Sequence, residues 1–178
     1  MRATMIARNY AEALFELGER SGTTDRYAEL LDAVAGAVET TPQVQGVLMS
    51  PRVPKAEKIR LLGAALKGAP REFVLFLQAL LKRGRQRLLS EISFEYQALL
   101  DIKHNRVRAG VTLARPADPA LQREIQEALS RELGKEVIAA FHADPEILGG
   151  AVVRIGERIH DGSVRRRMTK LRRQMLSG

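Results

Sequence analysis

The spacing of apolar residues changes once along this 178-residue chain, close to residue 105. Before that point, apolar residues recur every three or four positions, which is the period of an amphipathic helix. Between residues 106 and 113 they alternate with polar residues or glycine, which is the period of a strand with one covered face. Because one segment cannot satisfy both periods, we expect an α-helical domain over 1–105 and a small α/β domain over 106–178.

Six helices are expected in the first domain, with apolar stripes that span residues 6–17, 27–38, 44–48, 59–66, 73–81 and 88–99. Turn-forming residues separate the stripes, and we predict that Gly18 and Gly22 bracket the end of the first helix. The connections are short, which favours a compact antiparallel six-helix bundle.

The second domain combines strands with helices. Strands are expected over 106–113, 137–141, 151–155 and 158–160, with a hairpin turn at Gly156-Glu157 between the last two. Asp118-Pro119 is typical of a helix start, and Gly134 of its end. A last helix is expected after Ser163, with an inward stripe of Val164, Met168, Leu171 and Met175.

The sequence contains no convergent set of catalytic groups. It has no cysteine, and its three histidines, His104, His142 and His160, are too far apart for a ligand-spaced pair. No serine lies in a nucleophile-elbow context, and no glycine cluster has the spacing of a dinucleotide or phosphate loop. We therefore predict no catalytic residue, no metal site and no cofactor.

A net charge of +8 raises nucleic acid, an anionic membrane or an acidic protein as partners. Much of this charge falls in the last helix, in Arg165, Arg166, Arg167, Lys170, Arg172 and Arg173. Aromatic residues make up only 4% of the chain, which disfavours a stacking platform for single-stranded nucleic acid. The longest apolar run, 73–81, is far too short to span a bilayer, and Glu12 and Glu16 argue against an export signal.

Two features exceed what a small bundle and sheet require. The first helix carries two apolar stripes, and segment 73–81 is apolar on more than one face. Both helices are either central in the bundle or border a groove for a partner's amphipathic helix, with Ala13 and Ala79 permitting close approach. Gly149-Gly150 indicates either a turn with positive φ or close packing against another surface.

These same segments resemble a known family, the delta subunits of bacterial F-type ATP synthases, whose mitochondrial relative is the oligomycin-sensitivity-conferring protein. The resemblance covers nearly the whole chain in order. It is carried by residues 7–15, by 50–54 with Lys58, by 73–81 with 83–85 and 88–89, and most specifically by 147–156 with 159 and 161–164.

The resemblance implies a non-catalytic stator subunit that links the catalytic α/β head to the b-subunit peripheral stalk, so that rotor torque driven by ion flow is coupled to ATP synthesis. The N-terminal bundle would bind the N-terminal helix of an α subunit between its first and fifth helices, at Tyr10, Ala13, Leu14, Phe76 and Ala79. The C-terminal domain would contact the C-terminal end of the b subunit, through Gly149, Gly150, Arg166 and Lys170.

The resemblance also implies a monomeric protein, present in one copy per complex and held at the cytoplasmic face of the bacterial plasma membrane only through that complex. It implies no cofactor and no specific nucleic acid. Two alternatives remain from the residues themselves, because the positive charge also suits an RNA-binding helical module or a basic last helix on a membrane surface.

Overall fold

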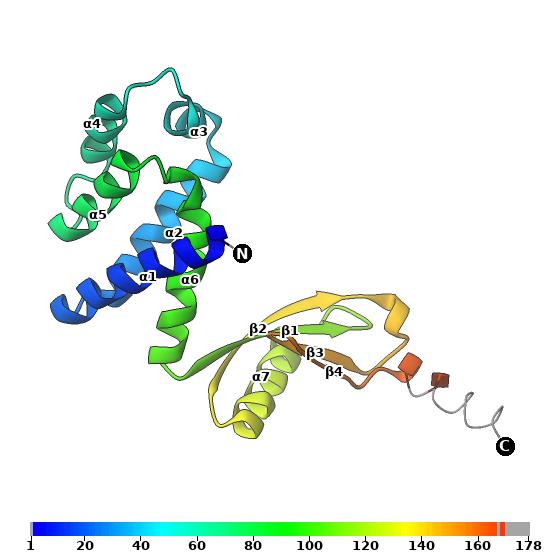
Figure 1. Ribbon diagram of the computed structural model, residues 1–178. Coiled ribbons are helices and arrows are strands. Elements are labelled where there is room, and N and C mark those ends of the chain that lie inside the picture. Colours follow the sequence, from blue (N-terminus) through cyan, green and yellow to red (C-terminus); the bar gives the residue numbers. More distant parts are fainter. Residues whose placement is uncertain (1, 167, 170–178) are drawn as a thin grey trace. The chain divides into compact units, whose positions relative to one another are not determined.

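The computed structural model describes residues 2–166, 168 and 169 (Figure 1). The chain divides into two compact units, Met1–Asp101 and Ile102–Gly178. We call them the helical unit and the sheet unit. The chain is mostly helical, with one small four-stranded sheet. Within the described residues, no helix combines the length and the apolarity that a bilayer span requires.

The helical unit consists of helices joined by short turns. Their bounds are α1 Arg2–Ser21, α2 Thr24–Thr40, α3 Pro42–Met49, α4 Lys55–Ala65, α5 Arg71–Lys82, the 3-10 turn η1 Gln86–Leu88, and α6 Leu89–Lys103, which runs on past the unit's end. Proline lies at the start of three of them, where its fixed φ and missing N–H cost least: Pro42 begins α3, and Pro54 and Pro70 immediately precede α4 and α5.

The first helix ends at Ser21, between the two glycines that the sequence predicts to bracket its end. Only Gly22 is a stop, with φ of 66°, whereas Gly18 lies inside α1 and is buried. A Cβ on Gly18 would lie 3.0 Å from Thr24 Cγ2 and 3.1 Å from the Tyr96 hydroxyl. The predicted bracket is confirmed, and Gly18 within it also allows α1 to pack closely against the start of α2 and against α6.

The core of the helical unit forms around one side of α1. Ala7, Ala11 and Leu14 are fully buried, at the i, i+4 and i+7 spacing of a single helix face. The largest side chains packed into the same core come from α2, α5 and α6: Tyr27, Leu31, Phe73, Leu77, Leu80, Ile92 and Tyr96. Burial of each large apolar side chain contributes about 1.5–3 kcal/mol, so this cluster dominates the stability of the unit.

A buried cation closes the turn between α3 and α4. Lys58 is only 5% exposed, and its Nζ donates hydrogen bonds to the carbonyl oxygens of Leu48 at 2.7 Å and Ser50 at 2.8 Å. The last carbonyls of a helix have no partner within the helix, and a positive charge there also complements the helix dipole. Lys58 therefore holds the end of α3 against α4.

We expect Lys58→Met to lower the free energy of unfolding by about 1–3 kcal/mol, because it leaves the Ser50 carbonyl without its donor. The matched control is Lys55→Met: Lys55 also donates to a helix-end carbonyl, that of Lys82, but it is exposed. We expect a change within about 0.5 kcal/mol for the control. Guanidinium unfolding measures both, and equal losses in the two variants would contradict the assignment.

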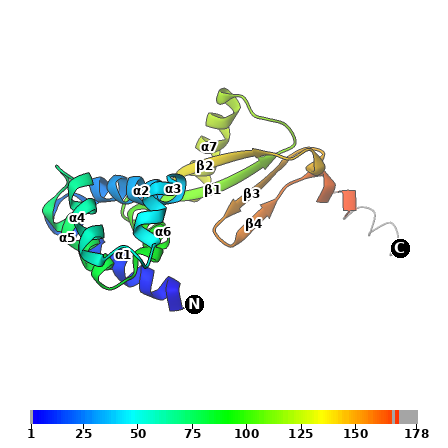
Figure 2. The same ribbon diagram turned by 90° about the horizontal axis from the view of Figure 1, so that it is seen from above.

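The sheet unit is a four-stranded sheet in the order β2-β1-β3-β4. Its elements are β1 Arg106–Leu113, α7 Pro119–Leu133, β2 Glu136–Ala143, the 3-10 turn η2 Pro145–Ile147, β3 Ala151–Ile155 and β4 Arg158–Asp161. β1 and β2 are parallel and α7 connects them, lying beside β2 in both ribbon views (Figures 1 and 2). β3 pairs antiparallel with β1 and with β4.

Local sequence explains the bounds of these elements. Asp118 caps α7, because its side chain accepts hydrogen bonds from the backbone N–H groups of Ala120 and Leu121, and Gly134 ends the helix with φ of 63°. The alternation along β1 places Ala109 and Val111 in the interior, with Val137 of β2. The predicted hairpin turn at Gly156-Glu157 joins β3 to β4.

Candidate protein-interaction surfaces

An aromatic contact joins α1 to α5. The rings of Tyr10 and Phe76 meet edge to face, with centroids 6.0 Å apart, and both side chains are half-buried. Ala13 and Ala79 each lie three residues further along their own helix, which puts them on the same side as the aromatic contact. Both alanines are exposed. We call the surface formed by these four residues the α1–α5 face.

One predicted contact residue is not part of this face. Leu14 is fully buried in the core of the helical unit, so it supports the α1–α5 face from beneath and presents nothing to a partner. Leu75, which the sequence did not single out, is 50% exposed and lies one helical turn from Ala79. Its signal was present in the second apolar stripe of segment 73–81, but periodicity alone does not tell which stripe the core takes.

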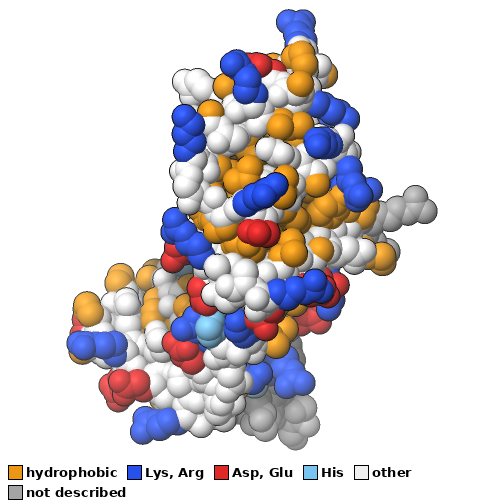
Figure 3. All heavy atoms as spheres, turned by 90° about the vertical axis from the view of Figure 1, so that its left-hand side faces the viewer, with side chains coloured by type: hydrophobic (Ala, Val, Ile, Leu, Met, Phe, Trp, Pro, Cys, Tyr) orange, Lys and Arg blue, Asp and Glu red, His pale blue; other side chains and the backbone are white. Residues whose placement is uncertain are grey.

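Two arginines border the α1–α5 face. Arg83 Nη1 and Arg85 Nη1 both donate to the Tyr10 hydroxyl, at 3.2 and 3.1 Å, and the Arg85 guanidinium lies 5.4 Å from the centre of the Tyr10 ring. The turn that brings them together has Gly84 in the left-handed region, with φ of 68°. One side of the molecule shows hydrophobic side chains gathered over the helical unit, with Lys and Arg side chains across and around them (Figure 3).

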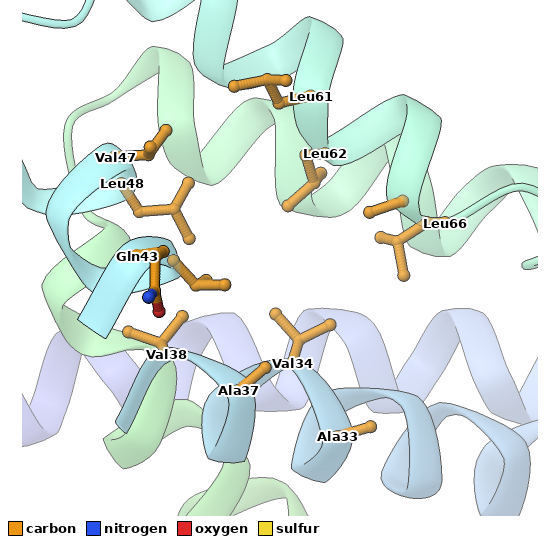
Figure 4. Close-up of a pocket in the computed structure, with 12 residues that line it drawn as sticks. Ala33, Val34, Ala37, Val38, Gln43, Val47, Leu48, Leu61, Leu62 and Leu66 are labelled. Carbon is orange, nitrogen blue, oxygen red and sulfur yellow. The ribbon is translucent and has the colours of Figure 1, made fainter. Parts of the chain in front are cut away.

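An apolar hollow lies elsewhere on the helical unit, between α2, α3 and α4. It has a volume of about 540 Å³. In the close-up, Val34, Leu62 and Leu66 point into it from two facing helices (Figure 4). The lining residues are Ala33, Val34, Ala37, Val38, Gln43, Val44, Val47, Leu48, Leu61, Leu62, Ala65 and Leu66. Sequence patterns do not reveal this hollow, because its residues form ordinary single stripes on three short helices.

In the sheet unit, the glycine pair packs against the turn that follows β4. Gly150 has φ of 78°, and a Cβ there would lie 2.5 Å from the Gly162 carbonyl oxygen. Backbone hydrogen bonds hold the two segments together, from Gly162 to the Ala151 carbonyl and from Val164 to the Gly149 carbonyl, both at 2.9 Å. Both interpretations of the glycine pair, positive φ and close approach, therefore apply to Gly150.

Side-chain hydrogen bonds organise the start of the last helix. Hydrogen bonds from the Ser163 hydroxyl and backbone N–H hold the pKa of the Asp161 carboxyl below its ordinary value. The Ser163 hydroxyl also accepts from the backbone N–H of Arg166, which is the pattern of a helix N-cap. Arg166 is exposed, as a partner contact requires. Lys170, the other predicted basic contact, lies outside the described residues.

Exposed apolar side chains lie next to the glycine pair and continue into the last helix. Leu148 is 66% exposed, Val164 39% and Met168 57%. Helical periodicity predicts Val164 and Met168 on an inward stripe, and for these two residues that prediction is wrong. Val164 lies against the edge of the glycine pair, since a Cβ on Gly149 would be 3.1 Å from Val164 Cγ2, and it keeps its other side exposed. We call Leu148, Val164 and Met168 the sheet-unit patch.

Leu148 has a strained backbone. Its φ is 63°, in the left-handed region that costs a leucine roughly 1–2 kcal/mol. A strained non-glycine residue persists where the surrounding structure imposes it, and such residues concentrate at functional sites. Leu148 gains little from burial, and its apolar side chain stays exposed next to the glycine pair.

We expect Gly150→Ala to destabilise the protein more than Gly156→Ala. Both positions have positive φ, which costs each alanine about 1 kcal/mol. Only at Gly150 does the new Cβ meet another segment, the Gly162 backbone, whereas nothing lies within 4 Å at Gly156. Denaturant unfolding should show an excess loss of about 1–3 kcal/mol at Gly150. Equal losses would mean that the close approach is absent in solution.

The described residues offer no ready metal site. In this part of the chain, no three His, Cys, Asp or Glu side chains are placed to hold a metal ion. What the two units do present is exposed apolar surface beside arginine. Exposed apolar surface of this kind is typical of a protein that binds other proteins.

Comparison with known proteins identifies the family. The family described as ATP synthase delta (OSCP) subunit matches residues 6–175. The ATP synthase subunit delta of Gemmatimonas aurantiaca is 41% identical, covering 96% of this chain and 92% of the relative. That of Desulforamulus reducens is 34% identical, covering 97% and 96%. The chain belongs to the ATP synthase delta (OSCP) family.

The fold agrees with this membership. A chain in the cryo-EM structure of the Toxoplasma gondii mitochondrial ATP synthase hexamer superimposes with a TM-score of 0.74, covering 96% of this chain and 97% of that chain, at 18% identity. Membership makes the chain a structural subunit of ATP synthase, not a catalytic one, with the role of a stator.

Proposed function

We propose that the helical unit acts as a six-helix bundle that binds the N-terminal helix of an ATP synthase α subunit on the α1–α5 face. One observation carries this proposal: Ala13, Leu75 and Ala79 are exposed beside the Tyr10–Phe76 contact, so the face is apolar and small residues leave room on it. Such a surface suits an amphipathic helix, which buries its apolar face against a hydrophobic groove.

The sheet unit is proposed to bind the C-terminal end of the b subunit. The sheet-unit patch supports this, because it exposes apolar side chains next to the glycine pair and one helical turn beyond Val164, with Arg166 on the same helical segment. Lys170 remains part of the proposal, although it lies outside the described residues. The functional division at residue 105 belongs to the same proposal: residues 1–105 serve the head and 106–178 serve the stalk.

A stator joint of this kind needs slow dissociation from both partners. Once one unit is bound within the complex, the other meets its partner at a high effective concentration, so the two contacts reinforce each other. We propose one copy per complex, monomeric when free, held at the cytoplasmic face of the bacterial membrane only through the other subunits. In this role the chain needs neither a cofactor nor nucleic acid.

We expect Ala13→Asp to weaken binding of a synthetic peptide with the N-terminal sequence of the α subunit by at least about 2 kcal/mol, or roughly 30-fold, because the carboxylate would be buried without a partner. Isothermal titration calorimetry with the full chain measures this. The matched control is Ala33→Asp, an exposed alanine that lines the hollow between α2, α3 and α4. Its affinity for the peptide should be unchanged.

The same pair of variants shows where the helix binds. Loss of affinity in Ala33→Asp with none in Ala13→Asp would place the peptide in the hollow between α2, α3 and α4 and overturn this part of the proposal. Unchanged affinity in both variants would exclude both the α1–α5 face and the hollow as the binding site.

For the sheet unit, Leu148→Asn should separate binding from stability. Asparagine tolerates the left-handed region better than leucine, so the free energy of unfolding should stay constant or rise. Affinity for a peptide from the C-terminal end of the b subunit should fall about tenfold, since an exposed leucine is lost from the contact. The control is Ile159→Asn on β4, which is 52% exposed and outside the patch. Wild-type affinity in Leu148→Asn would contradict the proposed contact.

A further inference from the structure

The positive charges of Arg83 and Arg85 are not neutralised by the contacts that the two side chains make. Both guanidinium groups donate to one neutral acceptor, the Tyr10 hydroxyl. Each guanidinium has five N–H donors and suits a carboxylate in a two-pronged geometry. Among the described residues, neither arginine forms an ion pair with a carboxylate of the chain, although other arginines, such as Arg8 and Arg60, do. The chain itself has no acidic residue between Glu72 and Glu91.

The backbone fixes the positions of the two residues, and their shared contact with the Tyr10 hydroxyl orients the side chains before any partner arrives. The Arg83 N–H donates to the Ala79 carbonyl, and the Arg85 N–H donates to the Leu80 carbonyl at 3.0 Å. Gly84 between them turns the chain at φ of 68°. As a result, two residues on either side of one glycine reach the same hydroxyl. A preformed pair of donors loses less side-chain entropy on binding than two free arginines would.

The position of the pair decides what it meets. Tyr10 contacts Phe76 on one side and the arginines on the other, so the pair lies at the edge of the α1–α5 face, at the C-terminal end of α5. A ligand there contacts apolar surface and two cations together. An amphipathic helix with a carboxylate at one end matches this combination. A phosphate backbone matches the cations but gains nothing from Leu75 and Ala79.

We infer that Arg83 and Arg85 bind an acidic side chain, Asp or Glu, of the helix that docks on the α1–α5 face, and thereby set its direction and register. The inference rests on the proposed function, because it assumes that an amphipathic helix occupies this face. It goes beyond the proposed function by naming the chemical group of the partner that is bound here, a carboxylate. The apolar contact allows the helix to slide or reverse, whereas a single charged hydrogen-bonded pair at one edge does not.

The test is a double-mutant cycle on the full chain, measured by titration calorimetry with the same α-subunit peptide. One set of peptides changes each acidic residue in turn to its amide. The protein variants are Arg85→Gln, the double variant with Arg83→Gln, and Arg85→Lys. We expect one amide peptide to bind the wild-type protein about tenfold more weakly than the unmodified peptide does. For the double variant, the unmodified peptide and this amide peptide should bind with equal affinity.

Arg85→Lys keeps the charge but loses the fork, so it should retain only part of the affinity. The matched control is Arg87→Gln, which removes an exposed arginine from the same turn without a contact to Tyr10. Its affinity should equal that of the wild type. Denaturant midpoints show that each variant is folded, and Arg85→Lys remains informative if the double variant is not.

The outcomes separate this inference from the proposed function. If the wild type does not bind the peptide at all, the proposed function fails and the inference falls with it. If it binds, but every amide peptide binds equally well and the arginine variants match the wild type, only the inference fails. If Arg87→Gln and Arg85→Gln lost the same peptide affinity, long-range electrostatic attraction would explain the effect, and the inference would be overturned.

Nucleic acid provides the last arm of the test. A single-stranded RNA of about 20 nucleotides, longer than a typical single-strand site, should bind only weakly, and equally to the wild type and to the double variant. Tight RNA binding that the double variant abolishes, with peptide binding unchanged, would assign the arginines to phosphate and overturn the inference.

Discussion

The close packing of one side of α1 into the helical core determines which of its residues a partner can reach. Ala7 and Ala11 are small enough to bury completely, and Gly18 lets the helix approach Tyr96 within contact distance. Since the core takes this side, Tyr10 falls at its border, next to α5. The apolar surface available for docking is therefore a consequence of which stripe the core uses, and the arginines of the following turn are positioned by it.

Close packing also constrains the sheet unit, but there the contact is between two backbone segments. Gly150 approaches the Gly162 carbonyl more closely than any residue with a Cβ allows, and hydrogen bonds from the following turn close the contact. Beside this contact, Leu148 and Val164 remain exposed. In both units, small residues at a close contact therefore lie next to apolar side chains that stay at the surface.

This arrangement suits a protein that resists torque and performs no chemistry. Apolar burial supplies most of the free energy of such contacts, but it is non-directional and does not by itself fix a helix in one register. Charged hydrogen bonds supply direction at modest cost when their donors are already held in place, as Arg83 and Arg85 are by the turn at Gly84. A joint that combines the two is both tight and oriented.

The sequence by itself determined the kinds of elements and their order, because the helix and strand periods and the turn residues act over only a few neighbours. Asp118, Gly134 and the hairpin at Gly156 are examples. Only the tertiary structure decided which of two apolar stripes is buried. It placed Leu14 inside and Leu75 outside, made Gly18 a packing residue, and turned Val164 outward. These outcomes depend on contacts between segments distant in sequence, and local periodicity carries no information about such contacts.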